Sequence, residues 1–185
     1  MASDGVKSTV GGGDGADDLR ANYNDEDGTI FTSGFGDDTL RGGNFDDIFN
    51  GGAGNDQMFG GAGADQFRFN GGQAKARDMI EGGSDTDFIR DLNFGEGDSI
   101  VLGGFGAGKF EDDLANGVNA FDGGNDVQIS SYEGLRSLAD SGDIVVTALP
   151  NGNLLVSITN ATGQVQNISI TGGADDYAAT AGEPT

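Results

Sequence analysis

Between residues 33 and 68 the chain places one large apolar residue at every ninth position. These residues are Leu40, Phe49, Met58 and Phe67. Each is the middle of three residues that can form a short strand, and the side-chain period of two turns the middle residue inward and its neighbours outward. The stretches between these triplets are rich in glycine and aspartate. The pattern therefore predicts short strands that share one core and are separated by tight turns.

The repeat divides without gaps into four units. They read SGFGDDTLR (33–41), GGNFDDIFN (42–50), GGAGNDQMF (51–59) and GGAGADQFR (60–68). Each fits Gly-Gly-x-Gly-x-Asp-x-U-x, in which U is the apolar residue, and only Ser33 and Phe45 depart from it. A fifth unit, GGDGADDLR, lies at 12–20, and residues 21–32 resemble a worn copy with Ile30 or Phe31 at the core position. A flexible acidic linker would not keep this register.

The fixed positions of each unit suit a metal ion with oxygen ligands. Glycine at the first, second and fourth places lets the backbone take left-handed conformations that bring carbonyl oxygens close to one point. These carbonyls and the carboxylate at the sixth place are hard donors, and Ca2+ takes about six to eight such oxygens. We therefore expect each unit to contain a calcium-binding turn followed by a core-forming strand.

This repeat resembles the RTX, or hemolysin-type, calcium-binding nonapeptide repeat. The resemblance implies an all-β fold, a parallel β-roll in which each unit makes half a turn. On that geometry Leu40 stacks with Met58, and Phe49 stacks with Phe67. It also implies several Ca2+ ions, each held between one turn and the turn two units later on the same edge. The upper turn would offer the carbonyls of places one and three and its Asp, and the lower turn those of places two and four and its Asp.

The resemblance assigns candidate calcium ligands residue by residue. One site joins Ser33, Phe35 and Asp38 to Gly52, Gly54 and Asp56, and the next joins Gly42, Asn44 and Asp47 to Gly61, Gly63 and Asp65. A weaker candidate joins Gly12, Asp14 and Asp17 to Gly34, Gly36 and Asp38. The first and third places of the last two units add Gly51, Ala53, Gly60 and Ala62.

The strict period stops after residue 68 and returns further along the chain. Residues 82–90 (GGSDTDFIR) place Gly82, Asp85 and Asp87 at ligand positions. Residues 91–102 (DLNFGEGDSIVL) are similar to a segment that commonly follows RTX repeats. Asp91 and Asp98 in that segment are either ligands of a last calcium site or residues that only cap turns.

The C-terminal part has a different pattern. Residues 143–149, 153–159 and 164–171 alternate apolar with polar residues and are separated by turn sequences, which predicts an antiparallel meander. Short helices are expected at 110–116 and 131–139. We therefore divide the chain into a disordered N-terminus (1–11), an RTX β-roll (12–111), a mainly antiparallel cap with one or two short helices (112–171) and a disordered acidic tail (172–185). The cap would cover the open end of the solenoid.

Composition narrows the function. The 185 residues carry a formal charge of −22, which argues against nucleic-acid and anionic-membrane partners and favours cations. No apolar run is long enough for a membrane span or resembles a cleaved signal. The chain has no cysteine and no histidine, which removes thiolate metal sites, Ser-His dyads and His-ligated zinc. We expect no catalysis.

The resemblance implies a C-terminal module of a bacterial protein that is secreted through a type I machinery, stays outside the cell and folds there on binding calcium. The tail would then carry part of the export address, or it is a linker to another domain. We expect the chain to be a monomer. The alternative function is a module that binds a polysaccharide or cell surface through its outward side chains. Those side chains are Thr39, Arg41, Ile48, Asn50, Gln57, Phe59, Gln66 and Arg68.

Overall fold

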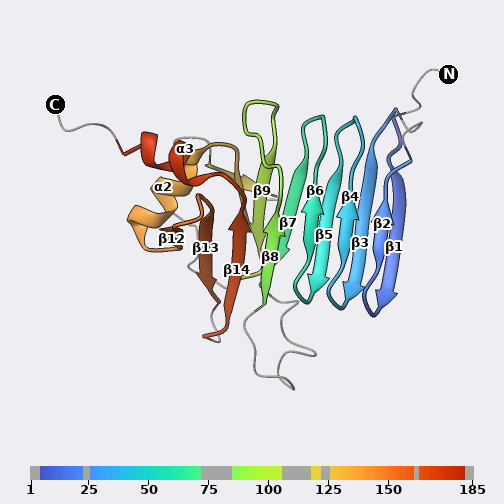
Figure 1. Ribbon diagram of the computed structural model, residues 1–185, viewed down its shortest axis with the longest axis horizontal. Coiled ribbons are helices and arrows are strands. Elements are labelled where there is room, and N and C mark those ends of the chain that lie inside the picture. The colour runs from blue at the N-terminus through green and yellow to red at the C-terminus, as the bar shows by residue number, and fades with distance from the viewer. Residues whose placement is uncertain are drawn as a thin grey trace.

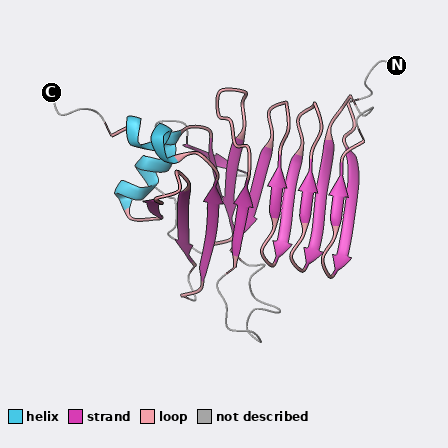
Figure 2. Ribbon diagram, in the orientation of Figure 1, coloured by secondary structure: helices cyan, strands magenta, loops and turns pink. Residues whose placement is uncertain are grey.

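The chain folds into two long sheets with helices at one end (Figures 1 and 2). The computed structural model describes residues 5–22, 26–71, 85–105, 118–121, 126–160 and 163–181. It is mostly β, with 12% of the residues in helices. Strands that follow each other along the repeat alternate between the two sheets.

Within the described residues each sheet has seven strands. The first sheet contains, in spatial order, β1 (Ser8–Asp14), β3 (Thr29–Phe35), β5 (Ile48–Ala53), β7 (Gln66–Asn70), β9 (Ser99–Gly103), β11 (Asp126–Ile129) and β10 (Val118–Phe121). The second contains β2 (Asp18–Arg20), β4 (Thr39–Arg41), β6 (Gln57–Phe59), β8 (Thr86–Ile89), β14 (Val165–Ile170), β13 (Leu154–Thr159) and β12 (Val145–Ala148). We call β1–β9 the stack. Neighbours within each of its sheets are parallel, which is compatible with the predicted β-roll.

The core lies between the two sheets of the stack. Phe31, Phe49 and Phe67 are fully buried and stack face to face, with ring centroids 4.9 and 5.1 Å apart. On the second sheet, which faces these rings, Leu40 pairs with Met58, and both residues are fully buried. The predicted stacking pairs are confirmed. In the worn copy the core residue is Phe31, because the register pairs it with Phe49.

The C-terminal cap comprises β10–β14 with helices α2 (Tyr132–Ser141) and α3 (Ala174–Ala179). Strands β12, β13 and β14 form the antiparallel meander that the alternating pattern predicts. Helix α2 begins at Ser131, whose Oγ accepts the Gly134 N–H at 3.0 Å, and ends at Gly142 with a φ of 86°. The predicted helix at 110–116 lies outside the described residues.

The cap also extends the stack instead of only covering it. Strand β14 lies parallel to β8, so the second sheet runs from the stack into the cap without a break. Strand β11 lies antiparallel to β9 and continues the first sheet in the same way. None of the described helices is long and apolar enough to cross a membrane.

Two predictions of terminal disorder are wrong for part of their length. Residues 174–179 of the predicted tail form α3, which Arg136 holds: its guanidinium donates to the Tyr177 carbonyl at 2.8 Å and lies 4.4 Å from the Tyr177 ring centroid. At the other end β1 begins at Ser8 because it pairs with β3. Both segments are ordered by contacts with residues far away along the chain, which a local pattern does not reveal.

Candidate calcium-binding turns

Aspartates from successive turns line up along both edges of the stack. We call the edge with Asp17, Asp38, Asp56 and Asp87 the first edge; its turns lie at the bottom of Figure 1. Each of the first three donates its backbone N–H to Oδ1 of the next Asp, at 2.8, 2.9 and 2.9 Å. The second edge repeats the arrangement with Thr29, Asp47, Asp65 and Asp98, at 2.6, 2.8 and 2.9 Å.

The second oxygen of four of these carboxylates has no protein partner. Oδ2 of Asp17, Asp38, Asp56 and Asp65 is buried and accepts no hydrogen bond from the residues that the structure describes. A buried carboxylate oxygen without a donor is costly, because it has lost its water and gained nothing in return. These four atoms therefore mark positions where a cation would be stabilised.

In every unit except 33–41, which has Ser33 there, glycine at the first place keeps the space beside the carboxylate open. A Cβ added to Gly51 or Gly60 would collide with Oδ2 of Asp56 or Asp65, respectively. At the second and fourth places Gly52 and Gly54 take φ values of 93° and 127°, which residues with a Cβ rarely adopt. The glycine spacing is therefore required by the turn geometry.

The ionised form of the buried carboxylates is destabilised. Burial, together with a smaller effect of neighbouring carboxylates on the same edge, raises the pKa of Asp56 and of Asp65 to about 7. Burial also raises the pKa of Asp38 and Asp98, and raises that of Asp87 well above its ordinary value. A divalent cation at these turns would favour the ionised form and so remove much of this penalty.

The donor set fits calcium. Within the described residues no three acidic side chains come together to hold a metal ion, so carboxylates alone do not form a site here. Carbonyl and carboxylate oxygens are the ligands that Ca2+ prefers, and the chain contains neither Cys nor His to attract a softer metal.

A family model for the RTX calcium-binding nonapeptide repeat, in four copies, matches residues 32–67. This stretch carries RTX calcium-binding repeats. RTX nonapeptide repeats bind Ca2+, in agreement with the open carboxylate oxygens. A search of curated proteins found no match to the chain.

The structure brings together the turns that the RTX geometry pairs. Gly34 lies beside Gly52, and the Asp38 N–H bonds Asp56, so turns 33–38 and 52–56 are neighbours as predicted. Turns 42–47 and 61–65 are joined by the Asp47 N–H to Asp65 bond. The third predicted pair is brought together by the bond from Asp17 to Asp38. That calcium binds in each of these places stays a prediction.

Beyond the RTX repeats the two edges continue to Asp87 and Asp98. Their second oxygens accept from the Gln166 side chain at 2.9 Å and from the Asn93 N–H at 2.8 Å, respectively. The Asp91 carboxylate accepts the Gly60 and Gly61 N–H groups at 2.8 and 3.1 Å. These bonds favour the turn-capping interpretation of Asp91 and Asp98.

The other predicted ligands of that region are less informative. Asp85 precedes β8, and its carbonyl accepts the Asn167 N–H at 3.1 Å. Gly82 lies outside the described residues. Sequence reasoning missed Thr29, which occupies the aspartate place in the worn copy. The 18-residue spacing from Asp47 to Asp65, applied once more toward the N-terminus, would have found it.

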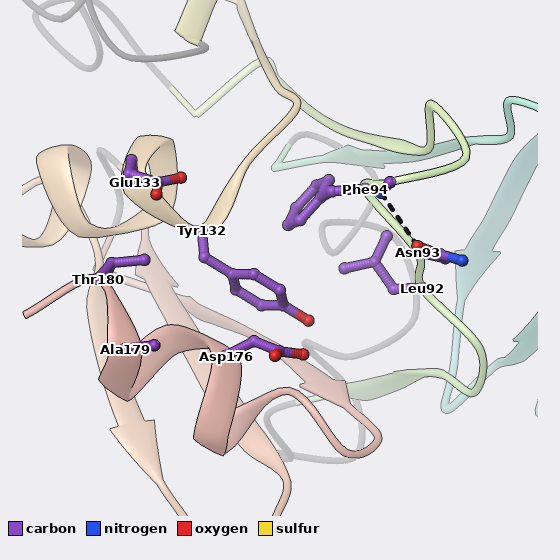
Figure 3. Close-up of a pocket in the computed structure, with 9 residues that line it drawn as sticks. Leu92, Asn93, Phe94, Tyr132, Glu133, Asp176, Ala179 and Thr180 are labelled. Atoms are coloured by element: carbon purple, nitrogen blue, oxygen red, sulfur yellow. Dashed lines mark hydrogen bonds between the residues drawn. The ribbon is translucent and has the colours of Figure 1, made fainter.

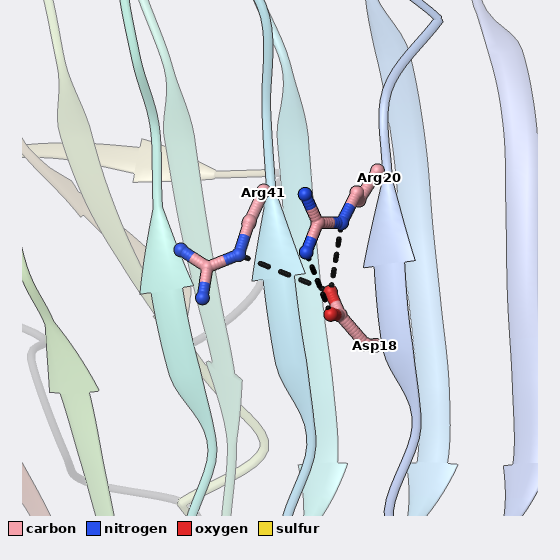
Figure 4. Close-up of polar contacts among 3 residues, drawn as sticks. All are labelled: Asp18, Arg20 and Arg41. Atoms are coloured by element: carbon pink, nitrogen blue, oxygen red, sulfur yellow. Dashed lines mark hydrogen bonds and ion pairs between the residues drawn. The ribbon is translucent and has the colours of Figure 1, made fainter.

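The outward side chains lie on two different faces. Arg41 is on β4 of the second sheet and Arg68 on β7 of the first, so the two arginines do not form a pair. On the second sheet Arg41 is instead in register with Arg20 on one side and Phe59 on the other. Its guanidinium lies 4.3 Å from the Phe59 ring centroid. Asp18 forms ion pairs with Arg20 at 2.8 Å and with Arg41 at 3.8 Å (Figure 4).

A shallow cleft of about 390 Å³ lies where residues 92–95 meet α2 and α3 (Figure 3). Tyr132 packs edge-to-face against Phe94 on one side of the cleft, with ring centroids 4.9 Å apart. Burial raises the pKa of Tyr132, and the nearby carboxylate of Asp176 raises it further. Glu133 also lines the cleft, so its surface is acidic and would disfavour an anionic ligand.

Proposed function

We propose that this chain is an RTX module that folds as a β-roll when calcium binds its turns, and that it has no catalysis of its own. The observation that carries the proposal is the set of buried Oδ2 atoms of Asp17, Asp38, Asp56 and Asp65 that no described donor satisfies. A fold that buries ionised oxygens in this way is poorly stable alone and is strongly stabilised by a cation that fits.

Calcium binding is coupled to folding because the expected ligands of one site follow different strands of the stack. The Asp38 and Asp56 carboxylates meet only because β3 and β5 pair side by side, so the unfolded chain has no such site. Ion binding is then part of the folding free energy. The chain's own residues supply the carboxylates, the carbonyls and the apolar residues that close over one another once the charges are compensated.

We further propose that this coupling supports export from a bacterium and stability outside it. At the low calcium level of a cytoplasm, a chain with a net charge of −22 and 36 glycines favours an extended state that suits a narrow channel. Millimolar calcium outside the cell would then fold it and oppose return. The resemblance to RTX repeats supports this role.

Far-ultraviolet circular dichroism of the purified chain tests the folding step. The chain is titrated with calcium from chelator to about 10 mM, and magnesium serves as the control because it demands a smaller octahedral site. We expect a cooperative transition to β structure with calcium alone, and its loss or a large shift to higher calcium in Asp56→Ala. A chain that is already fully folded in chelator would refute the proposal.

The register of Arg20, Arg41 and Phe59 favours a second candidate, an outer face that binds an acidic polysaccharide. Arginine and aromatic side chains on a flat strand surface suit carboxylated sugars. Asp18 already neutralises part of this charge, which weakens the candidate. Titration with a labelled acidic polysaccharide in calcium tests it, and equal binding by an Arg20→Gln/Arg41→Gln variant would exclude this face.

A further inference from the structure

The first turn of the second edge, residues 26–29, differs from the other turns of the RTX repeats. Thr29 stands where the following turns of this edge have Asp47 and Asp65. Its N–H donates to Asp47 Oδ1 at 2.6 Å, as an aspartate N–H does elsewhere, but its side chain brings no negative charge. A calcium ion between turns 26–29 and 42–47 would therefore lack the carboxylate that the following turns supply at this place, and the Asp27 carboxylate of the same turn accepts the Gly5 N–H at 3.2 Å.

The next turn along this edge also differs. The second oxygen of Asp47 accepts the N–H of Gly43 at 2.8 Å, whereas Oδ2 of Asp65 is buried without a partner. Gly43 does not take the positive φ that Gly52 and Gly61 have at the same place. Phe45 replaces glycine at the fourth place of this unit, and its Cβ disfavours the positive φ that Gly54 and Gly63 adopt there.

A cation from the chain itself reaches these two turns. The ammonium group of Lys7 donates to the carbonyl oxygen of Asp27 at 3.1 Å and to the carbonyl oxygen of Asp46. The first carbonyl belongs to turn 26–29 and the second to turn 42–47, so one positive charge bridges the pair. The backbone around Lys7 is fixed to the same turn, because the Ser8 N–H donates to the Gly28 carbonyl at 3.1 Å.

We propose that the Lys7 ammonium is the cation of this turn pair and that the pair holds together without calcium. An ammonium group offers three donors to backbone carbonyls and carries one charge, which suits a pair of turns in which only one of the two aligned positions, 29 and 47, is an aspartate. Its attachment to the chain removes the need to capture an ion from solution. This end of the second edge is then independent of calcium, whereas the turns around Asp56 and Asp65 are not. The inference goes beyond calcium-driven folding and does not depend on export.

The slope of unfolding free energy against the logarithm of free calcium concentration tests the proposal, because that slope counts the ions released on unfolding. Lys7→Met removes the charge and keeps the length of the side chain. Arg20→Met removes the same charge from the outer face of the neighbouring strand β2 and serves as the control. We expect Lys7→Met to lower the folding equilibrium constant about tenfold or more at every calcium concentration. The slope should stay that of the unchanged chain.

Two results would overturn the proposal. One is a Lys7→Met chain as stable as Arg20→Met; the other is a slope reduced in Lys7→Met, which would mean that calcium occupies this turn pair. If Lys7→Met does not fold at any calcium level, Lys7→Arg decides the question. A folded Lys7→Arg chain with an unchanged slope supports a purely electrostatic role. If the Lys7→Arg chain does not fold, another positive side chain cannot replace the Lys7 ammonium, and a purely electrostatic role is excluded.

Discussion

Replacing Asp56 by asparagine should change the stability of the fold in opposite directions with and without calcium. Asparagine has nearly the same shape as aspartate and keeps the Oδ1 that accepts the Asp38 N–H at 2.9 Å. In calcium the substitution removes a charged ligand, so it should destabilise the fold. In chelator it removes a buried charge that nothing compensates, so it should stabilise it.

The structure sets the size of the effect in chelator. Raising the pKa of Asp56 from 3.8 to about 7 corresponds to at most about 4 kcal/mol, at about 1.4 kcal/mol for each pKa unit. The asparagine NH2 group would replace the buried Oδ2 and find no acceptor, which costs about 1–3 kcal/mol. The net gain above pH 7 should therefore be about 1–3 kcal/mol.

The pH dependence has a definite sign. The folded chain keeps the Asp56 proton up to a pH near 7, whereas the unfolded chain releases it near 3.8. Calcium-free stability is therefore highest below that lower pKa and is lost as the pH rises through the higher one. Asparagine should therefore stabilise the calcium-free fold at pH 8, whereas near pH 4 only the cost of its unpaired NH2 group remains and it should destabilise the fold by about 1–3 kcal/mol.

The assay is urea unfolding followed by far-ultraviolet circular dichroism, in calcium and in chelator. In chelator, a fixed concentration of trimethylamine N-oxide brings both chains into the folding transition. Asp18→Asn is the control, because it makes the same change of charge at an exposed residue paired with Arg20. If Asp56→Asn also destabilises the fold in chelator at pH 8, the buried carboxylate is not the group that calcium compensates.

Three further predictions follow from the packing. Gly51→Ala places a Cβ on Oδ2 of Asp56 and should raise the calcium concentration at the folding midpoint severalfold. Gly43→Ala is the control, because its Cβ meets only the methyl group of Ala21 at 3.6 Å and should leave that midpoint nearly unchanged. A calcium titration of the two variants compares them. Phe49→Ala empties the space between two stacked rings and should cost about 3–5 kcal/mol in urea unfolding with calcium present. Ile168→Ala in the cap should raise the calcium midpoint of the whole chain, because this residue is fully buried beside β8. An unchanged midpoint would mean that the cap folds separately.

Most of the stack can be predicted from the repeat, because its fixed period determines which residues become neighbours. Nine residues make half a turn, so residues 18 apart must be neighbours, and the sequence therefore predicted the Phe49–Phe67 stacking and the Asp38–Asp56 pairing. Departures from the period were harder to interpret. The insertion before Thr29 hid its register until strand pairing placed Phe31 beside Phe49.

The remaining features depend on contacts between distant segments. Nothing near Lys7 in the sequence indicates that its ammonium group reaches the Asp46 carbonyl. Helix α3 is short and acidic, and it is held by Arg136, far away along the chain. The parallel pairing of β14 with β8 joins cap and stack, and alternation alone predicts only that β14 is a strand.

The second edge suggests why calcium would be required in the middle of the ladder and less at its ends, if the proposed function holds. In a stack whose layers contact only their neighbours, the buried polar groups of each layer must find hydrogen-bond donors within that layer or in the adjacent one. At the N-terminal end Thr29 brings no charge and the Lys7 ammonium binds the carbonyls. At the other end the Asn93 N–H satisfies the second oxygen of Asp98. Of the described carboxylates on this edge, Asp65 keeps a buried oxygen without a hydrogen-bond donor, and the uncharged hydroxyl of Thr29 is also buried without a partner. Calcium would then complete a ladder whose ends the chain has already closed, and folding would not require every layer to capture an ion.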